Sequence, residues 1–158
     1  SALVMAETGH SVLATLHTNN ANQALDRIIH FFPVDWREQV LLDLSLNLQA
    51  IVAQQLVPTA AGQRRAVFEV FINTPFVADL IAKGEVRQLK DAMAKSGEAG
   101  MQTFDQALFE LYSAGEISYD NAMAFAESKN DLRLAIKLKD DPTVSDASTE
   151  AFVIDLAD

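Results

Sequence analysis

Residues 8–20 decide the fold class, and they read Thr8-Gly9-His10-Ser11-Val12-Leu13-Ala14-Thr15-Leu16-His17-Thr18-Asn19-Asn20. The run 12–16 is almost wholly apolar, which predicts a buried strand. Polar side chains follow at its exit, and open α/β sheets bind ligands beyond the carboxyl ends of their strands. Asn19 or Asn20 is placed to cap a following helix, whose free N–H groups favour an anion. The stretch therefore predicts a phosphate-sensing turn between a strand and a helix.

Apolar spacing after this stretch predicts two helices and a second strand. Residues 21–31 have apolar side chains at helical intervals. Asp35, followed by Glu38, has the pattern of a capping box and predicts a helix from there to about residue 56. Residues 66–72 are rich in Val, Phe and Ile, which predicts a strand, and their weak alternation indicates burial on both faces.

The chain is expected to be all-helical beyond Asn73. Thr74, Thr103 and Ser118 are good N-cap residues, and Gly84 and Gly115 are good helix ends. The expected helices cover residues 75–83, 85–95, 103–114 and 118–127, and a last helix, 132–139, is capped by Asn130 or Asp131.

These elements predict an α/β fold that is mostly helical and divided in three. Residues 1–73 would contain a sheet, residues 74–139 a helical subdomain, and residues 140–158 an acidic tail without basic residues. The composition of this tail predicts disorder. Residues 152–154 are its one apolar patch and could dock on a partner. The alternative is that they are simply part of a frayed chain end.

Composition excludes several classes of function. The chain has 158 residues, 49% of them hydrophobic, which is enough for an ordinary core. Its formal net charge of -10 argues against a nucleic-acid partner, because nucleic-acid interfaces are basic. The chain has no cysteine, which excludes disulfides and thiolate zinc sites and fits a cytoplasmic protein. His10 and His17 lie seven positions apart along an expected strand, too far to share one ion, so we expect no metal site.

Several stretches carry a resemblance to a known family. Besides residues 8–20, they are residues 21–33, Gln54-Gln55-Leu56-Val57, Gly100-Met101-Gln102-Thr103-Phe104-Asp105, and residues 130–138, which resemble the end of PilU-type members. Together they resemble the PilT/PilU family of type IV pilus retraction ATPases, within the secretion ATPase superfamily, over residues 1–138. The four-cysteine insertion of assembly ATPases is missing after Val57, which favours the retraction branch.

The resemblance implies a hexameric motor with a RecA-like fold of the P-loop NTPase class, which binds ATP and magnesium and drives pilus retraction in twitching motility. The chain contains no Gly-x-x-x-x-Gly-Lys-Ser/Thr loop, and the family's acidic magnesium-binding strand would precede Ser1. We therefore expect a piece of a longer ATPase, inactive by itself and without bound cofactor. The implied partners are identical subunits, a PilT-like ATPase and the inner-membrane pilus platform protein, so the expected location is cytoplasmic and peripheral to that membrane.

The resemblance also assigns roles to single residues. It places His17 and Thr15 near the terminal phosphate of the nucleotide, with Thr18 and Asn19 beside them, and identifies Thr8, Gly9 and His10 as part of the family's histidine box. Glu7 matches an acid with an expected subunit contact. Structural roles remain open: His17 as a core histidine bonded to a carbonyl, His10 as a loop stabiliser, and Thr18 or Asn19 as simple caps.

A second function remains open beside the motor. The chain can instead be a non-catalytic oligomerisation or docking module that accompanies a PilT-like motor, with nucleotide incidental. ATPase activity of the intact protein separates the two.

Overall fold

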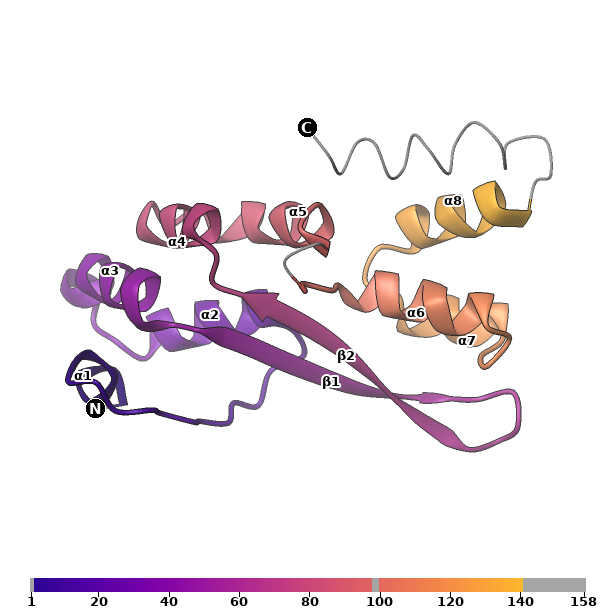
Figure 1. Cartoon of the computed structure of the whole chain (residues 1–158), viewed down its shortest axis with the longest axis horizontal. Coiled ribbons are helices and arrows are strands. Elements are labelled where there is room, and N and C mark those ends of the chain that lie inside the picture. The colour runs from indigo at the N-terminus through magenta and orange to yellow at the C-terminus, as the bar shows by residue number, and fades with distance from the viewer. Residues whose placement is uncertain (1, 98–99, 141–158) are drawn as a thin grey trace.

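A computed structural model describes residues 2–97 and 100–140. The elements in order are α1 (Ala2–Glu7), α2 (Ala21–His30), the 3₁₀ turn η1 (Val34–Trp36), α3 (Arg37–Asn47), β1 (Ala50–Pro58), β2 (Arg64–Ile72), α4 (Pro75–Ala82), the 3₁₀ turn η2 (Val86–Gln88), α5 (Leu89–Ala94), α6 (Phe104–Ser113), α7 (Tyr119–Phe125) and α8 (Lys129–Asp140). A long β1–β2 hairpin runs through the molecule, and the helices gather along it in two groups (Figure 1). Helices α1 to α5 form one group, and α6 to α8 form the other.

The hairpin is antiparallel, and its register pairs Ile51 with Phe71 and Val57 with Arg65. Antiparallel strands place alternate side chains on opposite faces, and here one face is buried by helices while the other is largely open. Phe71 is fully buried, whereas Phe68 is 44% exposed. The strand predicted at 66–72 is confirmed, but its expected burial on both faces is wrong.

The helix predicted from Asp35 to residue 56 is correct only in its first half. Helix α3 ends at Asn47, and residues 50–58 form β1 instead. Asp35 lies inside η1, and no side chain caps α3, so the expected capping box is absent there. The backbone of β1 is satisfied by β2 rather than by a helix, because a ready partner strand lies a short loop away.

Most of the predicted caps are confirmed. Thr74 accepts a hydrogen bond from the Val77 N–H, and Ser118 accepts one from the Asn121 N–H. Thr103 and Gln106 form a complete capping box at α6, which satisfies two of the free N–H groups of that helix end.

The last helix begins earlier than expected. Helix α8 starts at Lys129, and the Leu132 N–H donates to the Ser128 carbonyl. Asn130 and Asp131 therefore lie inside the helix, and neither is its cap.

The strand predicted at residues 12–16 is not formed. Residues 10–18 have no regular secondary structure, and Leu13 is fully exposed at 101%. A strand requires a neighbour to bond its backbone, and the sheet found among the described residues contains β1 and β2 alone. The apolar run 12–16 thus lies open as an extended segment between α1 and α2 (Figure 1).

Two hydrophobic clusters fill the interior, and the hairpin contributes to both. The first contains buried residues of α2 to α5 together with Phe71. The second contains Val57 and Val67 of the hairpin with buried residues of α6, α7 and α8, including Phe104 and Leu108. Each cluster therefore combines residues from before and after Asn73. The acidic tail expected at 140–158 lies, except for Asp140, outside the described residues.

Candidate functional site

The stretch 8–20 is fixed at its beginning by the end of α1. Gly9 has a φ of 84°, a left-handed conformation that glycine adopts without a steric penalty, and it follows the end of the helix. The Thr8 hydroxyl donates to the Met5 carbonyl at 2.9 Å and lies 3.1 Å from His10 Nδ1. His10 therefore contacts the end of α1, in keeping with its loop-stabilising alternative.

His17 lies in the extended part of the stretch, with its side chain exposed. Its backbone carbonyl accepts a 2.8 Å hydrogen bond from Arg27 Nη1 on α2. The expected position of His17 on the carboxyl rim of a sheet is wrong, because residues 10–16, which lead to it, form no strand. The imidazole is instead displayed to solvent ahead of α2, as is the side chain of Thr15.

The N-terminus of α2 is satisfied by the protein's own side chains. Asn20 is the N-cap, and its Oδ1 accepts from the Gln23 N–H at 2.8 Å. The Asn19 N–H donates to Gln23 Oε1, and the Ala21 N–H donates to the Glu69 carboxylate at 2.7 Å. The sequence predicted an anion at this helix end, and that anion is Glu69. A phosphate does not fit here, because Glu69 already supplies the negative charge.

Glu69 is a buried carboxylate in the middle of the hairpin, only 2% exposed. Burial raises the pKa of Glu69, and the Ala21 N–H opposes that rise. The nearby Glu127 raises the pKa further, while Lys90 lowers it. Glu69 therefore belongs to a group of charges that determine one another's ionisation.

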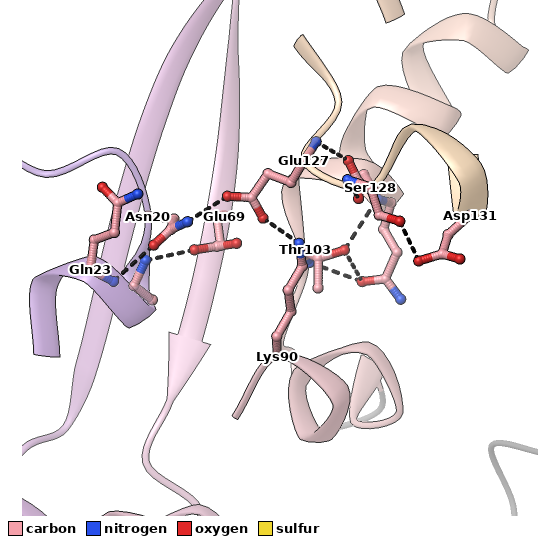
Figure 2. A network of polar contacts seen from close by, with 11 residues as sticks. Asn20, Gln23, Glu69, Lys90, Thr103, Glu127, Ser128 and Asp131 are labelled. Carbon is pink, nitrogen blue, oxygen red and sulfur yellow. Dashed lines mark hydrogen bonds and ion pairs between the residues drawn. The ribbon is translucent and has the colours of Figure 1, made fainter. Parts of the chain in front are cut away.

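Glu127, in the turn between α7 and α8, joins three elements of the structure. One carboxylate oxygen accepts a 2.6 Å hydrogen bond from Asn20 Nδ2, and the other lies 2.8 Å from Lys90 Nζ of α5 (Figure 2). Burial lowers the pKa of Lys90, but the bond to Glu127 and the surrounding negative charge outweigh it, so the pKa is raised overall. Lys90 is therefore held as a cation between the helices.

Asp105, the last residue of the Gly100–Asp105 motif, fixes the backbone of the same turn. Its two carboxylate oxygens accept from the N–H groups of Glu127 and Ser128, each at 2.8 Å. The same motif is anchored to β2, because Gln102 and Val70 exchange backbone hydrogen bonds of 3.0 and 2.8 Å. The motif thus positions a contact between β2 and the turn that joins α7 to α8.

The structure groups the predicted site residues only in part. Thr8 and His10 contact each other, and His17 and Asn19 are both held against α2, but Thr15 and Glu7 are exposed and stand apart. Sequence reasoning missed Glu69, Lys90 and Glu127. The sequence offered one indication for Glu69, because it is the one acid within the apolar strand 66–72. It offered no such indication for Lys90 or Glu127.

The described residues form neither a metal cluster nor a membrane-spanning helix. Within residues 2–97 and 100–140, no three His, Asp or Glu side chains gather as metal ligands, and the expected absence of a metal stays a prediction. None of the helices in this part of the chain is long and apolar enough to cross a membrane.

Comparison with known proteins identifies relatives of the chain. The family described as Type II/IV secretion system protein matches residues 1–103. The type IV pilus ATPase PilU of Pseudomonas aeruginosa is 68% identical over 138 residues, which are 87% of this chain and 36% of PilU. The retraction ATPase PilT of the same organism is 40% identical over 77% of this chain and 35% of its own length. The chain thus spans about a third of the length of these relatives.

Solved structures agree with the sequence relatives. The crystal structure of the pilus retraction motor PilT with bound ADP matches with a TM-score of 0.75 and 36% identity, over 84% of this chain and 37% of that one. The ATPase DotB of Legionella pneumophila matches with a TM-score of 0.65 and 25% identity, over 77% of this chain and 33% of DotB.

Proposed function

Because the chain belongs to the PilT/PilU branch of the type II/IV secretion system ATPases, we propose that it is part of a hexameric motor that hydrolyses ATP to retract type IV pili. Its fold is part of a RecA-like ATPase core followed by a helical subdomain. The observation that carries the proposal is the 68% identity to PilU over 138 residues. Identity at that level extends over most of this chain.

The nucleotide-sensing part of the proposal rests on His17, Thr15, Thr18 and Asn19. The exposed imidazole of His17 and the exposed Thr15 hydroxyl are free to donate hydrogen bonds to a phosphate. Arg27 holds the His17 backbone, so movement of the ring is transmitted to α2. In this proposal the groups that sense phosphate lie on the extended stretch. The N-terminus of α2 is not the phosphate site, because its Ala21 N–H already donates to Glu69.

The remaining residues of the histidine box have supporting roles in this proposal. Thr8, Gly9 and His10 form the bend that directs the stretch away from α1. Glu7, at the exposed end of α1, is proposed to contact the neighbouring subunit of the hexamer.

ATP with magnesium would supply the free energy of phosphoanhydride hydrolysis in the intact protein. The residues of this chain would bind phosphate oxygens through His17 and Thr15 and would exclude the nucleotide from the Glu69 side of α2, where like charges repel. Identical subunits, a PilT-like ATPase and the pilus platform protein of the inner membrane are the proposed partners, on the cytoplasmic side. The proposed division is a core at 1–73, a helical subdomain at 74–139 and a tail at 140–158.

The test is ATP turnover of the intact protein with and without His17→Ala. We expect the variant to lose about tenfold or more of its turnover, the effect of losing a hydrogen bond to a charged group. His30→Ala is the matched control, because His30 is also exposed and its Nδ1 lies 2.6 Å from the Asp26 carbonyl oxygen of its own helix. A protein that forms hexamers and never hydrolyses ATP would favour the docking module instead.

A further inference from the structure

Two stretches that are far apart in the sequence meet at one carboxylate. The His17 stretch ends at Asn20, and the Gly100–Asp105 motif ends at Asp105. The Asn20 side chain contacts the Glu127 carboxylate (Figure 2). The Asp105 carboxylate accepts a hydrogen bond from the Glu127 backbone N–H. We propose that Asp105 and Glu127 form a positioning relay that ties the phosphate-sensing stretch to the C-terminal helices.

The first step of the relay fixes the backbone of Glu127. Asp105 accepts from two successive N–H groups, those of Glu127 and Ser128, at 2.8 Å each. Charge-assisted bonds of this kind are about twice as strong as neutral ones and hold the acceptor in a defined orientation. Asp105 itself is held in the first turn of α6, between Thr103 and Gln106, the two residues of the capping box. The turn 126–128 therefore follows the position of α6.

The second step carries this position to the start of α2. The Glu127 carboxylate accepts from Asn20 Nδ2 at 2.6 Å, and Lys90 neutralises its second oxygen at 2.8 Å. The Glu127 side chain is only 16% exposed, so water competes poorly for these bonds. Asn20 uses its other side-chain atom, Oδ1, to cap α2, so the same amide serves both the helix and the relay.

A displacement of His17 must therefore act on Glu127. Asn20 lies three residues beyond His17, and Arg27 fastens the His17 carbonyl to the same helix. When the stretch moves, either the Asn20–Glu127 bond breaks or the turn between α7 and α8 moves with it. This inference rests on the proposed function for its direction, from phosphate to helices, but the mechanical link can be measured without nucleotide.

The test is amide hydrogen exchange in the chain of 158 residues carrying Asp105→Asn. Asparagine keeps the size of the side chain but offers one acceptor where two N–H groups donate. We expect exchange at the amides of Ala21 and Gln23, on the other side of the relay, to rise about tenfold, since local opening sets these rates. Asp120→Asn is the matched control, because Asp120 is an exposed acid in the first turn of α7.

A variant at the other end of the relay, Asn20→Ala, tests the coupling in the opposite direction. If Asp105 had only a local role, this variant would not change exchange at the residues that Asp105 binds. Asn20→Ala should raise exchange at Glu127 and Ser128, because coupling between two sites is reciprocal. If Asp105→Asn alters only residues 127–133, or raises exchange evenly through α3 and α4 as well, the relay is refuted. Glu127→Gln, which retains an acceptor for Asn20, should have a smaller effect than Glu127→Ala, and equal effects would also refute it. Failure of ATP turnover with an intact exchange response would count against the proposed function alone.

Discussion

The Ala21 N–H and the Glu69 carboxylate meet at 2.7 Å in the interior of the protein, joining the start of α2 to the middle of β2. Hydrogen bonds to charged groups contribute about 1.5–3 kcal/mol, but a buried carboxylate also loses its hydration. Burial therefore raises the pKa of Glu69 above its ordinary value of 4.5, and stability depends on its ionisation.

Glu69→Gln should become more stable relative to the wild type as the pH rises. The raised pKa means that the protonated form favours folding, and this contribution is complete below pH 4.5 and is lost as the pH rises through the folded-state value. Glutamine keeps an acceptor for Ala21 and does not ionise, so at about pH 5 its free energy of unfolding should lie within about 1 kcal/mol of wild type.

Urea unfolding between about pH 5 and about pH 8 measures this difference. Glu110→Gln, an exposed acid on α6, is the control and should show no comparable trend. A difference between Glu69→Gln and wild type that stays constant over this range would contradict the assignment.

Phe71→Ala should remove a large part of the stability of the first hydrophobic cluster. Phe71 is fully buried there. Truncation of such a side chain typically costs about 3–5 kcal/mol of unfolding free energy, because the transfer free energy of the removed atoms is lost and a cavity is left. Phe76→Ala, at a side chain that is 60% exposed on α4, should cost less than about 1 kcal/mol. Chemical denaturation of the two variants gives the comparison, and similar losses would be inconsistent with the described core.

Thr103→Ala should destabilise the protein by about 1 kcal/mol, because it removes the hydroxyl that accepts from the Gln106 N–H. Thr103→Ser keeps that hydroxyl and should recover most of the loss. Thermal unfolding followed by circular dichroism measures both. A serine variant as unstable as the alanine variant would show that the methyl group, and not the cap, is what matters.

Arg27→Ala should release the His17 stretch without unfolding α2. The 2.8 Å bond from Arg27 Nη1 to the His17 carbonyl is the described link between the two, and Arg27 contributes little to the core. Backbone order parameters of residues 15–18 from NMR relaxation should fall, while those of residues 22–29 stay unchanged. Arg64→Ala, an exposed arginine at the start of β2, should change neither set.

Local signals in the sequence were sufficient for the caps of α4, α6 and α7. Thr74, Thr103 and Ser118 each bond the N–H three residues later, and that interaction depends only on neighbouring residues. The resemblance to the pilus ATPases was also sufficient for the fold class and the family.

Non-local pairing explains the main errors. Leu44, Leu48 and Ile51 continue at helical spacing across the true end of α3, so the periodicity concealed β1. What makes residues 50–58 a strand is their pairing with β2, which no local pattern records. The strand predicted at residues 12–16 is wrong for the opposite reason. These residues have the composition of a strand, but no strand pairs with them in the part of the chain that is described.

The polar contacts of the candidate site were beyond sequence reasoning for a similar reason. Asn20 and Glu127 are 107 positions apart, and nothing near either residue indicates the other. Glu69 alone was recognisable, because a single acid in an apolar strand has to find a donor when it is buried.

The hairpin that supplies side chains to both hydrophobic clusters also decides how the chain can be shortened. Val57 and Val67 belong to the same hydrophobic cluster as buried residues of α6, α7 and α8, so a version trimmed after Ile72 would expose their apolar side chains. Any minimal piece for crystallography or spectroscopy that retains the two histidines near its start therefore has to extend at least to Ile136.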